Sequence, residues 1–93
     1  MERVEIELTS RQVEILLVYS YPFDEEEEQL KSFAGKPGNH RLKSDEFYLP
    51  RLIGDLVYSA KTIHDETLLE EFDEICTIIE STISQKAGTS TLF

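Results

Sequence analysis

The chain has 93 residues and a formal net charge of −10, from 19 acidic and nine basic side chains. A chain of this length forms one domain, which buries about two thirds of the surface that the unfolded chain exposes. Its negative field repels nucleic acid and anionic membrane surfaces, so we expect direct binding to neither. Hydrophobic residues make up 40% of the chain, which excludes a disordered tail.

Cysteine content and hydropathy predict a cytoplasmic protein. Cys76 is the single cysteine and cannot form an internal disulfide, as expected in a reducing compartment. No hydrophobic run approaches the roughly 18 residues that span a bilayer. The N-terminus carries no signal-peptide pattern.

The first 20 residues predict a strand followed by a capped helix. Hydrophobic and charged residues alternate over residues 3–8, which is typical of a strand with one buried face. Thr9 and Gln12 have the spacing of a capping box, so a helix should begin there and end near Ser20. Its inward residues would be Val13, Leu16 and Leu17. Further apolar side chains remain for another element or a partner: Ile15, Val18, Tyr19 and Tyr21.

A second, acidic helix is predicted from Asp24, which we expect to be its N-cap. Glutamates at 25–28 fill its first turns, where the helix dipole favours negative charge. Its apolar face is thin, so this helix should be peripheral and end at Gly35. The composition of residues 35–39 is that of a loop.

The segment after this loop is harder to assign. Residues 40–43 are too short for a periodicity argument, although they could extend beside the N-terminal strand. Ser44 is a plausible cap for a helix from about Asp45, with irregular geometry before Pro50. Gly54 inside this helix suggests a close helix crossing.

Residues 49–83 hold two long helical stripes, separated at His64 and Asp65. Asp65 is a good N-cap for the second, so a tight antiparallel hairpin is predicted. Residues 1–86 would form the domain and 87–93 a flexible tail, unless 89–93 pair with the N-terminal strand. The predicted fold class is mainly α (α+β), with a short N-terminal strand followed by about four helices.

Several residue types suggest chemistry, but their placement argues against it. Cys76, together with His40 and His64, offers the groups of a thiolate mechanism. The cysteine lies on an apolar helical stripe, where burial would make it inert. We therefore predict no catalytic residue, no metal site and no cofactor. The alternative enzyme is a small Mg²⁺-dependent all-helical hydrolase. It would use an acidic pair from Glu70, Glu71, Asp73 or Glu74 and a second pair from residues 25–28.

The predicted function is that of a small acidic interaction module, which docks on a basic protein surface as an inhibitor, antitoxin-like neutraliser, adaptor or nucleic-acid mimic. A structural homo-oligomeric subunit without activity of its own is the alternative. Self-association as a dimer is expected through the N-terminal strand or the surplus apolar face. The candidate contact residues are Glu27, Glu28, Glu70, Glu71 and Glu74.

Overall fold

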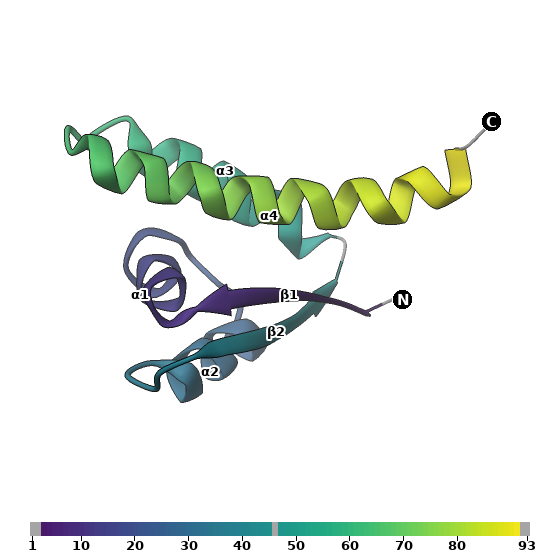
Figure 1. Cartoon of the computed structure of the whole chain (residues 1–93), viewed down its shortest axis with the longest axis horizontal. Coiled ribbons are helices and arrows are strands. Elements are labelled where there is room, and N and C mark those ends of the chain that lie inside the picture. Colours follow the sequence, from purple (N-terminus) through teal and green to yellow (C-terminus); the bar gives the residue numbers. More distant parts are fainter. Residues whose placement is uncertain (1–2, 46, 92–93) are drawn as a thin grey trace.

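The computed structural model describes residues 3–45 and 47–91, and within them it contains four helices and a two-stranded sheet (Figure 1). This confirms the mainly helical fold with a β element. In chain order the elements are β1 (Arg3–Thr9), α1 (Ser10–Tyr19), α2 (Asp24–Phe33), β2 (Asn39–Asp45), α3 (Tyr48–Ala60) and α4 (Glu66–Thr91).

The partner of the N-terminal strand is β2, which covers the segment that the sequence left unassigned. The two strands are antiparallel, with Ile6 opposite Leu42 and both side chains buried. On the outer face, Glu5 lies opposite Lys43, and its carboxylate forms an ion pair with Arg41 of β2 at 3.8 Å, a cross-strand contact of opposite charges that favours the pairing. The outer edge of β2 is closed by the Gln29 amide, which donates to the Lys43 carbonyl and accepts from the Lys43 N–H, both at 2.8 Å.

The capping box at the start of α1 is confirmed. Thr9 Oγ1 accepts from the Gln12 N–H at 3.2 Å, and Gln12 Oε1 accepts from the Thr9 N–H at 2.9 Å. Ile15, expected on a surplus apolar face, is a core residue with 1% of its surface exposed. Tyr19 lies edge-on to Phe72 of α4, with ring centroids 5.2 Å apart. The remaining surplus residues, Val18 and Tyr21, are exposed.

Two predicted caps are wrong. Asp24 is the first residue of α2, whose N-cap is Phe23 without a side-chain hydrogen bond. Ser44 caps no helix, because it continues β2 and its side chain points into the core. The chain turns one residue later, where Asp45 Oδ1 accepts from the N–H groups of Phe47 and Tyr48, both at 2.9 Å.

The interpretation of Gly54 as a helix crossing is also wrong. A Cβ placed on this residue would have no atom within 4 Å, and the residue is exposed on the outer side of α3. Its helix packs through the opposite face, where Leu52 and Leu56 are fully buried.

The predicted hairpin is confirmed by α3 and α4. Asp65 Oδ1 caps α4 by accepting from the N–H groups of Thr67 at 2.9 Å and Leu68 at 3.3 Å. The helix continues to Thr91, past the domain boundary predicted at residue 86. Flexibility of residues 87–93 stays a prediction, and the last two of them lie outside the described residues.

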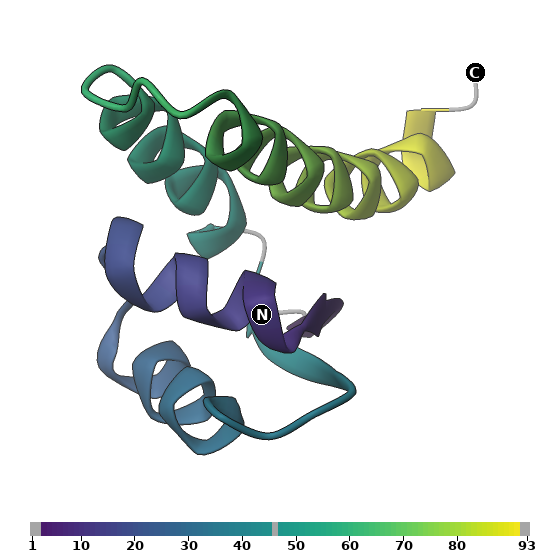
Figure 2. The same cartoon turned by 60° about the vertical axis from the view of Figure 1, so that its left-hand side comes forward.

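The molecule is layered, with the α3–α4 hairpin on one side, α1 and β1 in the middle and α2 on the opposite side (Figures 1 and 2). One apolar core joins the layers and draws on every helix and both strands. Among the described residues, no helix is both long enough and apolar enough to cross a membrane.

Candidate functional site

The five candidate acidic residues lie on two separate surfaces. Glu70, Glu71 and Glu74 belong to α4, whereas Glu27 and Glu28 belong to α2 on the other side of the molecule (Figure 1). A hydrolase site with one acidic pair from each run would need the two helices to face each other, which they do not. Within the described residues, no group of three His, Cys, Asp or Glu side chains is placed to hold a metal ion.

Two of these five carboxylates are engaged in ion pairs. Glu71 binds the Arg11 guanidinium through two contacts, Nε to Oε2 at 2.9 Å and Nη2 to Oε1 at 3.2 Å. This hydrogen-bonded pairing lowers the pKa of the Glu71 carboxyl. Glu27 lies 3.6 Å from Lys31 Nζ, one helical turn away. In the part of the chain that the structure describes, Glu70 and Glu74 have no ion pair and are exposed.

The exposed charged residues of α4 between Glu66 and Glu80 are all acidic. Residues 65–84 contain no Lys, Arg or His, so no basic residue lies between these acidic residues in the sequence. From Glu66 to Glu80 the helix rises about 21 Å at 1.5 Å per residue. The exposed acids along it are Glu66, Glu70, Asp73, Glu74 and Glu80.

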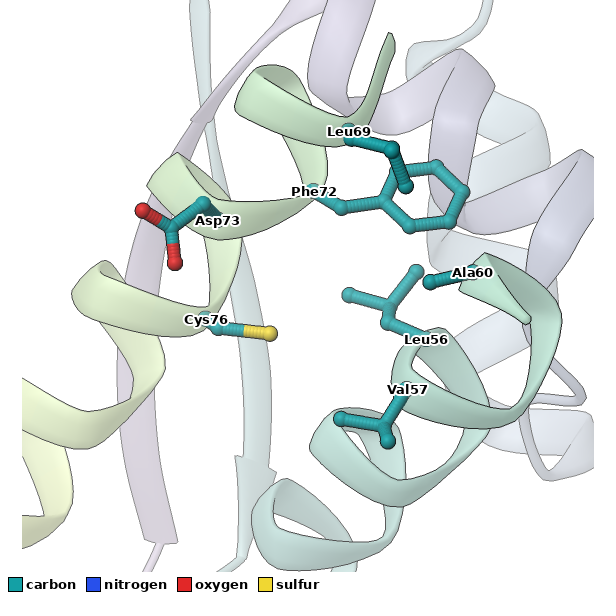
Figure 3. A pocket seen from close by; sticks show the side chains of 7 residues that line it. All are labelled: Leu56, Val57, Ala60, Leu69, Phe72, Asp73 and Cys76. Atoms are coloured by element: carbon teal, nitrogen blue, oxygen red, sulfur yellow. The ribbon is translucent and has the colours of Figure 1, made fainter. Parts of the chain in front are cut away.

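An apolar hollow lies between the two hairpin helices, beside this acidic surface. It has a volume of about 160 Å³, below the roughly 300 Å³ at which pockets for small-molecule ligands begin. The hollow therefore accommodates one apolar side chain and not a small-molecule ligand. Figure 3 shows Cys76 pointing toward α3, with Asp73 beside it and turned outward. The lining residues are Leu56, Val57 and Ala60 of α3, and Leu69, Phe72, Asp73 and Cys76 of α4.

On α4, two sets of residues recur every seven positions at or beside this hollow. Leu69 and Cys76 are seven residues apart and line it. Residues Glu66, Asp73 and Glu80 follow the same spacing on the adjoining exposed flank. Because seven residues make nearly two helical turns, each set forms a row along the helix. The apolar row is thus bordered by an acidic one.

Arg51 of α3 and Lys61, which follows this helix, do not border the hollow. The Arg51 guanidinium lies over the Phe23 ring, 4.9 Å from its centroid, and Lys61 Nζ lies 5.9 Å from the Tyr58 ring centroid. None of these four residues lines the hollow. Their cation–π contacts hold the positive charges elsewhere on the surface.

Cys76 is only half-buried, whereas the sequence predicted a buried thiol. Burial is nevertheless the main cause that raises its pKa, followed by the negative charges of Glu80 and Asp73. A raised pKa keeps the thiol protonated and weakly nucleophilic, as the sequence predicted. His40, one of the two proposed partners of a thiolate, stacks on Phe33 of α2 and bonds to the Lys36 carbonyl at 3.0 Å.

Sequence reasoning missed a buried polar cluster between α2, β2 and α3. Glu26, expected in a solvated run, is only 3% exposed, and its carboxylate accepts from Ser44 Oγ at 3.1 Å. Tyr48 is fully buried beside it, and its hydroxyl has no hydrogen-bond partner among the described residues. Burial raises the pKa of Tyr48, and the Glu26 charge adds to this shift. The available signal was spacing, because Glu26 precedes Leu30 by four residues on the same helical face.

No protein-family model matches the chain, and neither does any curated protein or solved structure with which it was compared. Function is therefore inferred from the geometry of the chain itself. That geometry combines a row of carboxylates that form no ion pair among the described residues with an adjoining apolar hollow on one helix pair. Such a surface is suited to bury an apolar side chain and to pair with cations around it.

Proposed function

We propose that this protein is an interaction module that docks on a basic protein surface through the outer face of α4. The observation that carries the proposal is the set of five exposed acids from Glu66 to Glu80, which includes Glu70 and Glu74 and has no intervening base. A continuous negative surface accelerates and orients encounter with a basic partner, and salt weakens the attraction.

Helix α4 packs on the rest of the domain, which makes its outer face a rigid docking surface. Ile75 and Ile79 are fully buried beneath it, and Glu71 is joined to Arg11 of α1. A surface that is already ordered loses less conformational entropy on association. In this proposal Glu71 positions the helix, whereas Glu70 and Glu74 contact the partner.

The α2 candidates form a second acidic surface, which has a different balance of charge. Glu27 is paired with Lys31, and the helix packs on the core through Leu30. Since α2 lies opposite α4, Glu27 and Glu28 serve as a matched control for the loss of two acidic groups.

The test is capture of partners by the immobilised full chain from native lysate, first at low salt and then at moderate salt. We expect a stoichiometric basic partner that salt releases. The double variant Glu70→Gln/Glu74→Gln should lose it, whereas Glu27→Gln/Glu28→Gln should retain it. Equal loss of the partner in both variants would mean that binding depends only on net charge. Retention of the partner by the α4 variant would overturn the proposal.

A further inference from the structure

We propose that the groove between α3 and α4 receives a basic amphipathic helix of the partner, with an apolar side chain in the hollow and Lys or Arg side chains along the acidic row of Glu66, Asp73 and Glu80. This inference rests on the proposed function, because it specifies what kind of segment the acidic module binds.

The apolar half of this recognition is provided by both helices. Val57 of α3 is 54% exposed, although it borders the apolar hollow. Leu69 and Cys76 face it from α4 and are half-buried. An inserted Leu, Ile, Met or Phe side chain would remove this surface from water, which favours binding. The volume of about 160 Å³ restricts the anchor to one such side chain.

A helix fits this groove better than an extended segment. Successive acids of the row are seven residues apart, or about 10.5 Å along the α4 axis. Lys or Arg side chains seven apart on a docked helix repeat at the same distance and lie on one face. Two antiparallel helices also present a groove into which the ridge of a third helix packs.

Charge complementarity selects a basic helix and argues against a second copy of this chain. Each helix of the described residues contains a single Lys or Arg. In α1 this residue is Arg11, which already forms an ion pair with Glu71. A second copy would therefore bring its own acids to the acidic row, where like charges repel. A foreign helix with an apolar stripe bordered by several cations meets both requirements.

The test measures binding of a synthetic helical peptide of Leu and Lys, with the leucines on one face, to the full chain at low salt by fluorescence anisotropy. A scrambled peptide of the same composition is the control for net charge. We expect saturable binding of the amphipathic peptide, and binding of the scrambled peptide weaker by about tenfold. Equal binding of the two peptides, or no saturable binding of the amphipathic one, overturns the inference.

Two pairs of variants locate the contact. Asp73→Asn/Glu80→Gln should weaken binding of the amphipathic peptide by about tenfold. Glu27→Gln/Glu28→Gln, with the same change in charge, should leave this binding unchanged. Val57→Glu should abolish binding, while Val18→Glu on another exposed apolar residue should leave it intact. Circular dichroism and thermal midpoints verify that each variant is folded. Equal effects within either pair would contradict the groove as the binding site.

The outcomes separate this inference from the proposed function. Loss of the lysate partner in Glu70→Gln/Glu74→Gln, together with unchanged peptide binding in Val57→Glu, would retain the acidic docking face and reject the groove. Dimers of the wild type that Val57→Glu dissociates would identify a second copy as the occupant and would also reject the basic helix.

Discussion

The Arg11 guanidinium of α1 and the Glu71 carboxylate of α4 form a two-point ion pair, with contacts of 2.9 and 3.2 Å. The pair joins the start of the N-terminal helix to the hairpin, across 60 residues of sequence. Both oxygens of the Glu71 carboxylate accept from Arg11, so Glu71 fixes α4 to α1 and is less accessible to a cation of another molecule.

The ion pair predicts a pH-dependent effect of Glu71→Gln. Pairing lowers the folded-state pKa of this carboxyl, so its stabilisation is complete above the unfolded-state pKa of about 4.3 and is lost as pH falls through the lower folded value. We expect a small decrease in thermal midpoint at pH 7, because the pair is solvent-exposed. The difference from wild type should disappear in acid. Thermal unfolding from pH 7 to pH 2 measures it.

The same series on Glu70→Gln is the control, because Glu70 lies on the same helix without an ion pair among the described residues. Its midpoint difference should not follow this pH dependence. Identical profiles for the two variants would mean that Arg11 contributes nothing specific to the folded state.

Ser44→Ala should destabilise the fold. The Ser44 hydroxyl is the donor to the buried Glu26 carboxylate, which would be left without that bond. Losing a partner of a buried acceptor costs about 1–3 kcal/mol of unfolding free energy. Urea denaturation followed by circular dichroism measures this cost. Recovery of stability in the double variant Ser44→Ala/Glu26→Leu would assign it to the stranded carboxylate.

Tyr48→Phe should leave stability unchanged or increase it. The Tyr48 hydroxyl is buried without a hydrogen-bond partner among the described residues, so its removal releases a desolvated polar group. The ring, which packs at 5.2 Å from Phe23, is retained. Denaturant midpoints of the variant and the wild type are the measurement. A clear decrease would show that the hydroxyl makes a favourable interaction in solution.

Gly54→Ala should stabilise the protein by about 1 kcal/mol, since alanine has the higher helix propensity and the added methyl group meets no atom within 4 Å. Gly35→Ala is the opposite control, because Gly35 has a φ of +79°, which a Cβ disfavours. Chemical denaturation compares the two variants. A destabilised Gly54→Ala protein would restore the idea of a close contact at this position.

Self-association is predicted to use the exposed apolar residues at the end of α1. The strand β1 pairs with β2 along one edge. Val18 and Tyr21 are the exposed part of the surplus apolar face, and the contact is predicted to lie there. We expect a sedimentation coefficient that decreases on dilution, and a monomer at all concentrations for Val18→Glu. A wild type that remains monomeric at high concentration would refute the dimer.

Local chemistry made several elements predictable. The capping bonds of Thr9 and Asp65 join groups no more than three residues apart, so the residue types and their spacing are sufficient to place two helix starts. Helical periodicity likewise identified the α3–α4 hairpin and its buried stripe, including Leu56, Phe72 and Ile79.

The errors at Ser44 and Glu26 arose where a distant segment outweighed a local preference. Ser44 has the chemistry of a cap, but pairing of β2 with β1 turns it inward toward Glu26. That carboxylate in turn resembles its acidic neighbours in sequence, and only the packing of α2 on the sheet buries it. Neither outcome is encoded within a few residues of the chain.

The sequence by itself determined the hairpin, the capped helix after the first strand and the strongly acidic character of α4, because these depend on periodicity, capping and composition. Only the tertiary structure decided that the two acidic helices lie on opposite sides and that the row of Glu66, Asp73 and Glu80 borders an apolar hollow. Such relationships depend on how helices pack across the core, and packing joins side chains that are far apart in sequence.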